Sequence, residues 1–178
     1  MARGMSGHEK PVEGIDTVWL SPPGLIHALG PFDLDPCAAP DPKPWPTAAK
    51  QITLPDNGLA QEWTGRVWLN PPYTKEIGKW FEKMRDHGSG IALIFARTEI
   101  DAWHEFIWPS AHSVFFFNGR LAFDLPDGTK AKGAGAPSAL ISFSEFDTNK
   151  IIDAKLHGAL CDRVRIWGKN GADLARRS

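Results

Sequence analysis

The segment RVWLNPPYTKEIGKWFEKMRDHGSGIALIF, residues 66–95, sets the architecture that this sequence predicts. It opens with a compact apolar strand over 66–70, which Pro71-Pro72 ends because proline fixes φ and has no N–H donor. A second apolar run over 91–95 predicts a buried strand. The residues between them have helical periodicity, so strand, helix and strand follow one another as in a βαβ unit with a parallel sheet.

The helix of this unit has an apolar face and recognisable ends. Its apolar residues recur at i, i+3, i+4 and i+7. They are Ile77, Trp80, Phe81 and Met84. Thr74 is a candidate N-cap residue, and Gly88 is a candidate terminator. A second helix is predicted from Thr98, which begins a capping-box pattern, to Trp108, where Pro109 closes it.

The flanking sequence predicts shorter elements. Before the βαβ unit, the first ordered element is expected to start near 18–20, 25–29 is a short helical stretch, and 32–35 is a strand candidate. The proline-rich segment 40–50 is predicted to be a surface loop, since closely spaced prolines exclude regular structure.

After the unit, Asn118-Gly119 joins apolar runs over 113–118 and 120–123, which is a strong hairpin signal. A strand over 138–143 and a final helix over 150–160 complete the prediction. We therefore expect an α/β fold with a mainly parallel central sheet and a late antiparallel hairpin.

Length and composition indicate one globular domain. The chain has 178 residues, of which we expect 1–14 to be a disordered lead-in, 15–170 a single domain and 171–178 a frayed tail. No apolar segment resembles a secretion signal or a membrane span, so we expect a cytoplasmic protein without membrane contact. A formal net charge of −1 means that any nucleic-acid contact must come from a local basic face.

Neither cysteine nor histidine spacing predicts a metal site. Cys37 and Cys161 are far apart and form no CxxC pair, which argues against a disulfide framework or a cysteine zinc site. His87, His104 and His112 lack the spacing of metal ligands. We expect no bound metal.

The tetrapeptide Asn70-Pro71-Pro72-Tyr73 carries the chemistry that the sequence indicates. It follows a predicted strand, and ligands of α/β sheets bind beyond the carboxyl ends of strands. An exocyclic amine of a base is a poor nucleophile, because its lone pair is delocalised into the ring. Two acceptors, the Asn70 amide oxygen and the Pro71 carbonyl, suit its two N–H bonds, while Tyr73 offers a stacking face for a flipped base. The alternative is a Pro-Pro turn followed by a core tyrosine.

The chain resembles the small phage-type DNA N6-adenine methyltransferases of phages and prophages over residues 19–143. The resembling segments are Trp19-Leu20-Ser21-Pro22, Phe32-Asp33-Leu34-Asp35-Pro36-Cys37-Ala38, Asp56-Asn57-Gly58-Leu59 with Trp63, Asn70-Pro71-Pro72-Tyr73, and Phe117-Asn118-Gly119-Arg120-Leu121-Ala122-Phe123. The resemblance implies a Rossmann-like class I fold with S-adenosylmethionine as the methyl donor. It also implies methyl transfer to the N6 amine of adenine in DNA, inside a bacterial host cell. It leaves open whether the role is protection from restriction.

The resemblance also implies a donor site. Its residues are Trp19, Ser21, Pro22, Asp35, Pro36, Cys37, Ala38 and Asp56. The chain departs from the family pattern in three ways: Ser21 replaces a threonine, Asn57 interrupts the Asp-Gly-Leu stretch, and no Gly-x-Gly fingerprint is present.

Basic residues near these motifs are predicted to contact DNA. They are Lys75, Lys79, Arg120, Lys130 and Lys132. The glycine-containing loop 124–136, which carries two of these lysines, is expected to touch the duplex, and an ordinary solvated loop is the alternative.

Other activities remain compatible with parts of the pattern. Ser21-Pro22-Pro23 approaches the motif of cytosine-N4 methyltransferases, but Gly24 supplies no stacking face. Pro36-Cys37 has the form used by cytosine-C5 enzymes, which need an activated thiolate. Protein glutamine methyltransferases share Asn-Pro-Pro-Tyr, and a catalytically silent DNA-binding relative would keep the fold.

Overall fold

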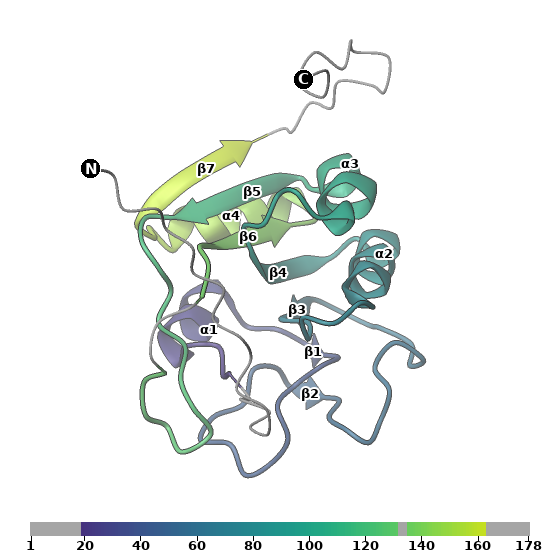
Figure 1. Cartoon of the computed structure of the whole chain (residues 1–178), viewed down its shortest axis with the longest axis vertical. Helices are drawn as coiled ribbons and strands as arrows, with labels where there is room; N and C mark the ends of the chain where they lie inside the picture. Colours follow the sequence, from purple (N-terminus) through teal and green to yellow (C-terminus); the bar gives the residue numbers. More distant parts are fainter. Residues whose placement is uncertain (1–18, 132–134, 163–178) are drawn as a thin grey trace, which may run out of the picture.

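The computed structural model describes residues 19–131 and 135–162, and in this part of the chain seven strands form one sheet (Figure 1). The strands are β1 (Leu34–Asp35), β2 (Lys50–Gln51), β3 (Val67–Leu69), β4 (Gly90–Phe95), β5 (Ser113–Phe117), β6 (Ser138–Ser142) and β7 (Gly158–Asp162). The helices are α1 (Pro23–Leu29), α2 (Ile77–His87), the π-helix η1 (Trp103–Ile107), α3 (Trp108–Ser110) and α4 (Glu145–Asp153).

The sheet has the order β2-β1-β3-β4-β6-β5-β7 and is parallel only in its first half. β1 pairs in parallel with β2 and β3, and β3 pairs in parallel with β4. β6 lies between β4 and β5 and runs antiparallel to both, while β7 extends the antiparallel half along β5. The prediction of a mainly parallel sheet therefore holds for the half that carries Asn70.

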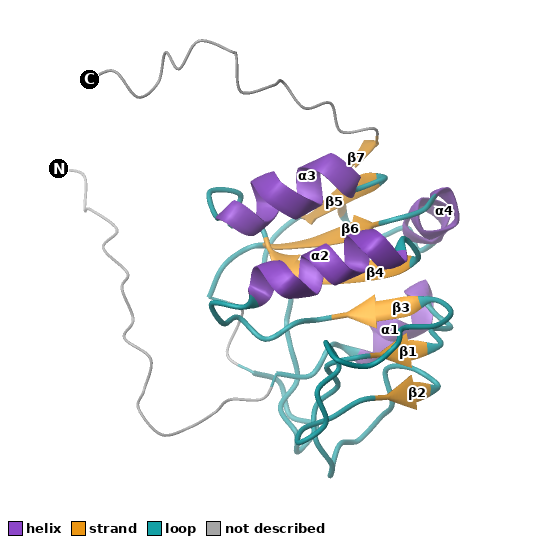
Figure 2. Ribbon diagram, turned by 90° about the vertical axis from the view of Figure 1, so that its right-hand side faces the viewer, coloured by secondary structure: helices purple, strands orange, loops and turns teal. Residues whose placement is uncertain are grey.

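Helices cover both faces of the sheet (Figure 2). Alternate strand residues point to opposite faces, so Leu69 packs with α2 and η1 while its neighbour Trp68 packs with α1. Phe81 of α2 and Trp103 of η1 are fully buried on the first face. Leu29 of α1 is fully buried on the second. This arrangement fixes β3 between two apolar layers.

The predicted βαβ unit is confirmed in β3, α2 and β4. α2 ends at Gly88, which has a left-handed φ of 74° and donates its N–H to the Met84 carbonyl. The helix begins two residues later than predicted, because Thr74 uses its hydroxyl to accept from the Glu76 N–H in the preceding turn. The next helix runs without a break from Asp101 through η1 into α3 and ends at Ser110, one residue beyond Pro109, where the prediction closed it.

The predicted hairpin at Asn118-Gly119 is wrong. Gly119 has a positive φ of 87° and does form a turn, but 120–123 does not return along β5. The partners of β5 are β6 and β7. The chain leaves the sheet because Phe123 is buried in the second core cluster and Asp124 forms an isolated bridge with Leu20.

The predicted helix over 150–160 is misplaced. Ser144 caps α4 by accepting the Asp147 N–H, so the helix starts earlier, and it stops before Lys155, whose φ is 47°. Gly158 opens β7 so close to β5 that a Cβ there would lie 2.1 Å from the Phe116 carbonyl oxygen.

The remaining expectations meet the structure only in part. α1 and β1 confirm the predicted short elements, and Leu20, at the expected start of the ordered chain, forms a single bridge with Asp124. The proline-rich loop is irregular up to Lys50, which begins β2. The expected lead-in and tail lie outside the described residues. Within 19–131 and 135–162, no helix has the length and apolar character needed to cross a membrane.

Candidate active site

Three parallel strands bring the predicted site residues to one edge of the sheet. Asp35 is the last residue of β1, Asn70 follows β3 directly, and Phe95 is the last residue of β4. Because these strands are parallel, their carboxyl ends lie at the same edge. Ser21 and Pro22 reach this edge from the start of α1.

Ser21 fixes the orientation of the Asn70 side chain. Its hydroxyl oxygen, in a residue only 3% exposed, lies 3.3 Å from Asn70 Nδ2, which donates to it. The same oxygen accepts from Trp68 Nε1 at 3.2 Å. Since the amide nitrogen is held by Ser21, the Asn70 amide oxygen points elsewhere, and no group of the described residues donates to it. It is therefore available as an acceptor.

Cys37 links the loop after β1 to the same asparagine. Its thiol donates to the Asn70 carbonyl oxygen at 3.3 Å, and its backbone N–H donates to Asp35 Oδ1 at 3.0 Å. Burial, with the nearby Asp35 charge, raises the pKa of the Cys37 thiol well above its ordinary value. A thiol held in its neutral form is a poor nucleophile, which disfavours cytosine-C5 chemistry.

Asp35 is a buried carboxylate whose charge is only partly compensated. Burial raises its pKa from 3.8 to about 6, against the opposing effects of the Thr47 hydroxyl, the Cys37 N–H and the Lys43 charge. No ion pair of the described residues includes Asp35. A buried acid in this state suits a cationic ligand, because a neighbouring positive charge would offset its desolvation.

The proline-rich loop contributes to this site, which sequence reasoning did not anticipate. Trp45 Nε1 donates to the Ser21 carbonyl oxygen at 3.1 Å, and Thr47 donates its hydroxyl to Asp35. Gln51 at the end of β2 accepts from the Thr47 N–H at 3.2 Å. The loop is thereby held against both Ser21 and Asp35. A tryptophan amid prolines was the only signal for this role, and no periodicity supported it.

Tyr73 stands at the exposed side of an aromatic cluster. Its ring lies 4.3 Å from the Phe95 ring at 15°, a stacked pair, and it is 47% exposed. Its hydroxyl oxygen accepts the Phe95 N–H at 2.8 Å. Trp19 and Phe123 extend the cluster, with Trp19 5.4 Å from Phe123 and 6.4 Å from Phe95. Phe95 and Phe123 were not predicted as site residues, because both read as ordinary strand residues.

The Asp56 segment packs against the predicted donor loop through its glycine, and the role of Asp56 itself stays a prediction. Asp56 is exposed on a turn, and within the described residues its only hydrogen bond runs from its N–H to the Thr53 carbonyl oxygen. Gly58 is buried against Pro36 of the predicted donor loop. A Cβ at Gly58 would lie 1.8 Å from the Pro36 carbonyl oxygen. The glycine is required by this close approach.

Replacing Gly58 by alanine is expected to destabilise the protein by about 1–3 kcal/mol, the usual cost of overpacking. The added methyl group must displace the Pro36 backbone and with it the loop that carries Asp35 and Cys37. Denaturant unfolding measures the loss. Gly24→Ala is the matched control, since a Cβ there meets nothing within 4 Å. Equal stability of the two variants would contradict the expectation.

The predicted DNA-binding residues differ in their local partners. Lys130 pairs with the buried Asp124 at 2.7 Å, and Lys79 pairs with Glu76 at 2.6 Å. Lys75 and Arg120 are exposed. Lys132 lies outside the described residues, so its predicted role and that of the loop 124–136 as a whole stay predictions.

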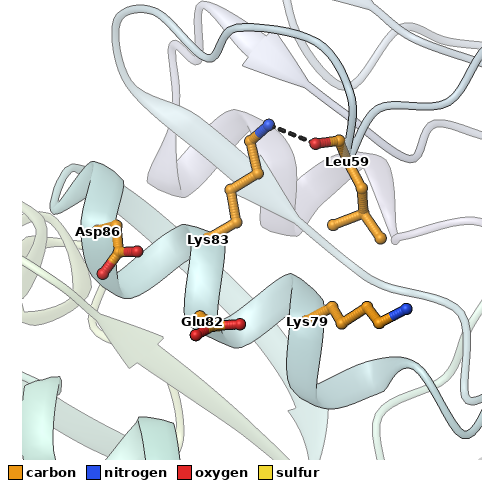
Figure 3. Close-up of a pocket in the computed structure, with 5 residues that line it drawn as sticks. All are labelled: Leu59, Lys79, Glu82, Lys83 and Asp86. Atoms are coloured by element: carbon orange, nitrogen blue, oxygen red, sulfur yellow. Dashed lines mark hydrogen bonds between the residues drawn. The ribbon is translucent and has the colours of Figure 1, made fainter.

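Lys79 lines a shallow pocket of about 310 Å³ on α2 (Figure 3). Leu59, Glu82, Lys83 and Asp86 complete its lining, and Lys83 donates to the Leu59 carbonyl oxygen at 2.6 Å. None of the predicted catalytic or donor-binding residues takes part in it. The pocket combines two cations with two acids, which does not suit a polyanion.

Two of the predicted non-ligand histidines have structural partners. His87 Nε2 lies 2.7 Å from the Gly65 carbonyl oxygen, and His112 Nδ1 lies 2.8 Å from the Thr148 hydroxyl. In the part of the chain that the structure describes, no group of three or more His, Cys, Asp or Glu residues is arranged to hold a metal ion.

Comparison with known proteins places this chain in a family. The family model described as DNA N-6-adenine-methyltransferase (Dam) matches residues 10–162, which include every segment that builds the site. No curated protein matches the chain, and no solved structure does. Because the matched region spans most of the sequence, the chain belongs to the Dam family of DNA N6-adenine methyltransferases.

Proposed function

We propose that this chain transfers the methyl group of S-adenosylmethionine to the N6 amine of adenine in DNA. The observation that carries the proposal is the orientation of Asn70: Ser21 holds its amide nitrogen, which leaves its amide oxygen to accept a hydrogen bond, and the second proposed acceptor, the Pro71 carbonyl, belongs to the next residue of the chain. These two acceptors match the two N–H bonds of an exocyclic amine. Membership of the Dam family supports adenine in DNA as the substrate.

The residues at the strand ends fit the methyl donor. S-adenosylmethionine supplies an electrophilic methyl group on a sulfonium, and its amino-acid part carries an ammonium. Asp35 offers a buried carboxylate for a cation, and the Trp19 ring offers an aromatic face. We assign Ser21, Pro22 and the loop from Pro36 to Ala38 to the walls of this site, since Ser21 and Cys37 bond to Asn70 and Asp35 and the other residues adjoin these two in the chain.

The substrate base would leave the helix stack to reach this edge, because its amine is inaccessible inside a duplex. Tyr73 would stack on the extruded ring while Asn70 Oδ1 and the Pro71 carbonyl accept its two N–H bonds. This grip pulls the amine nitrogen toward tetrahedral geometry and localises its lone pair. The amine nitrogen then attacks the donor methyl group in a single in-line displacement: the bond from methyl to sulfonium breaks, S-adenosylhomocysteine leaves as the thioether, and the methylated nitrogen loses one proton to water. Orientation and hydrogen bonding supply the acceleration.

The sheet topology is compatible with a Rossmann-like class I methyltransferase fold, which we propose for this chain. The parallel strands β1, β3 and β4 present their carboxyl ends to the site. The reversed strand β6 separates β4 from β5. Ligand sites of open α/β sheets lie outside such carboxyl ends, which agrees with the position of Asn70 and Asp35.

Product identification tests the proposal. Purified protein is incubated with S-adenosylmethionine and unmethylated DNA, which is then digested to nucleosides for mass spectrometry beside an Asn70→Ala control. N6-methyladenine that disappears in the control supports both the reaction and the role of Asn70. N4-methylcytosine would retain the acceptor chemistry and overturn the substrate. If the protein bound the donor but methylated no base, the substrate would be sought among protein glutamine side chains, or the chain would be a catalytically silent DNA-binding relative.

Tyr73→Ala is expected to raise the KM for DNA by about 10- to 100-fold, since stacking on an aromatic ring contributes about 1–3 kcal/mol per base. Tyr73→Phe keeps the ring and loses only the acceptor for the Phe95 N–H, so its KM should stay close to that of the wild type. Steady-state kinetics at saturating donor measures both values. Equal defects in the two variants would show that the hydroxyl, rather than the ring face, is what matters.

A further inference from the structure

Arg97 lies in the turn that holds the Tyr73 hydroxyl. It follows β4 by two residues and donates its N–H to the Phe95 carbonyl oxygen at 2.7 Å. In the same turn, the Phe95 N–H donates to the Tyr73 hydroxyl oxygen. Arg97 is therefore anchored at the carboxyl end of β4, next to the stacked rings of Tyr73 and Phe95.

The Arg97 side chain is exposed and has no ion pair or hydrogen bond within 19–131 and 135–162. Glu99 and Asp101 follow it closely in the sequence, but neither is paired with it. Its positive charge acts on Tyr73, whose pKa it lowers against the larger effect of burial.

Several cations of the described residues have a local carboxylate partner, whereas Lys50, Lys75 and Lys155 are exposed and, like Arg97, have no ion pair. Lys79 is paired with Glu76, Lys130 with Asp124, and Arg85 with Asp86 at 2.7 Å. Lys75 resembles Arg97 in being exposed without an ion pair, and it follows Tyr73 by two residues. The exits of β3 and β4 therefore each carry an aromatic ring followed two residues later by an unpaired cation.

A flipped nucleotide brings its own phosphates to the entrance of the site. The base stacks on Tyr73 only if the sugar-phosphate backbone passes beside that ring. A guanidinium matches phosphate oxygens with two parallel N–H bonds, and such contacts fix the register of a protein on DNA. A chain of net charge −1 needs this charge to be local.

We propose that Arg97 binds a phosphate that flanks the flipped nucleotide, and that Lys75, two residues after Tyr73, contacts the neighbouring DNA backbone. This inference rests on the proposed function, since it takes DNA as the substrate. It assigns to Arg97 the positioning of the nucleotide, while methyl transfer itself stays with Asn70.

Fluorescence anisotropy with a fluorescein-labelled unmethylated duplex, measured over a series of NaCl concentrations, tests the proposal. Arg97→Gln should weaken binding and reduce the slope of log K against log [NaCl] by about one, as expected for the loss of one phosphate contact. Arg85→Gln is the matched control, because it removes the same charge from a paired arginine on α2. Its slope and affinity should equal those of the wild type.

Calorimetric binding of S-adenosylhomocysteine is the second measurement, and it reports both correct folding and the donor site. Arg97→Gln should bind this compound as the wild type does. An unchanged salt slope, or a loss of S-adenosylhomocysteine affinity with normal DNA binding, would overturn the proposal and leave the proposed function intact. Failure of the wild type to bind DNA would overturn both.

Discussion

Asn70→Ala is expected to lower the rate of methyl transfer by about 10²- to 10³-fold, the usual cost of removing one preorganised hydrogen bond to the reacting group. The lost amide oxygen is the acceptor that Ser21 leaves free by holding Asn70 Nδ2 at 3.3 Å. Binding of donor and DNA should change little, because the contact strengthens only as the amine becomes tetrahedral. The effect should therefore fall on kcat rather than on KM.

Single-turnover methyl transfer with saturating protein measures this rate. Asn70→Asp is the conservative variant: it keeps an acceptor oxygen, and the Ser21 hydroxyl is able to donate to its second oxygen, so part of the rate should return. Ser21→Thr should retain activity because it keeps the hydroxyl, whereas Ser21→Ala should lose the orientation of the amide. An Asn70→Ala protein with the wild-type rate would contradict the mechanism.

The parts of the fold that the sequence predicted correctly depend on local patterns. Each correct prediction rests on residues that are close in the sequence. They are the strand at 66–70, the apolar face of α2 and the Gly88 terminator. Asn70 and Tyr73 were identifiable for the same reason, since their chemistry resides in a contiguous motif after a strand. Asp35 and Ser21 came from the family resemblance, and the structure brings both to the Asn70 edge.

The residues that were missed act through contacts distant in sequence. Phe95 at the end of β4 stacks on Tyr73, which follows the neighbouring strand β3. Trp45 donates to the Ser21 carbonyl from a loop whose sequence has no periodicity. The hairpin error has the same origin. The Asn118-Gly119 turn is a genuine local signal, but burial of Phe123 draws the following residues out of the sheet. Tertiary packing, which a local pattern does not encode, decides these positions.

Burial of the Asp35 carboxylate lowers the free energy of unfolding, although we propose that the same carboxylate binds the methyl donor. Its pKa is raised from 3.8 to about 6, so the folded state favours the protonated acid. Below pH 3.8 the carboxyl is protonated in both folded and unfolded chains and costs nothing. Above pH 6 it is ionised in both, and the difference between the two pKa values corresponds to about 3 kcal/mol of lost unfolding free energy. A cationic donor would recover part of this loss.

Asp35→Asn is therefore expected to stabilise the protein by up to about 3 kcal/mol at pH 8, which raises Tm by roughly 6–12 °C for a chain of this size. The amide keeps an acceptor for the Cys37 N–H, and the Thr47 hydroxyl remains a partner. The gain should shrink as pH falls from 6 toward 4, because the wild-type carboxyl becomes protonated. At the same time, affinity for S-adenosylhomocysteine should fall about 10- to 100-fold, since a charge-assisted contact is lost.

Thermal unfolding at pH 8 and pH 5, with and without S-adenosylhomocysteine, separates these two effects. The ligand should raise the Tm of the wild type more than that of Asp35→Asn, because stabilisation by a ligand follows its affinity. Asp33→Asn is a useful comparison: its carboxylate accepts the Arg66 N–H next to the sheet rather than in the donor loop, so ligand stabilisation should persist. If Asp35→Asn lowered Tm at pH 8 and kept full ligand stabilisation, the carboxylate would be a structural group and the donor's cationic part would bind elsewhere.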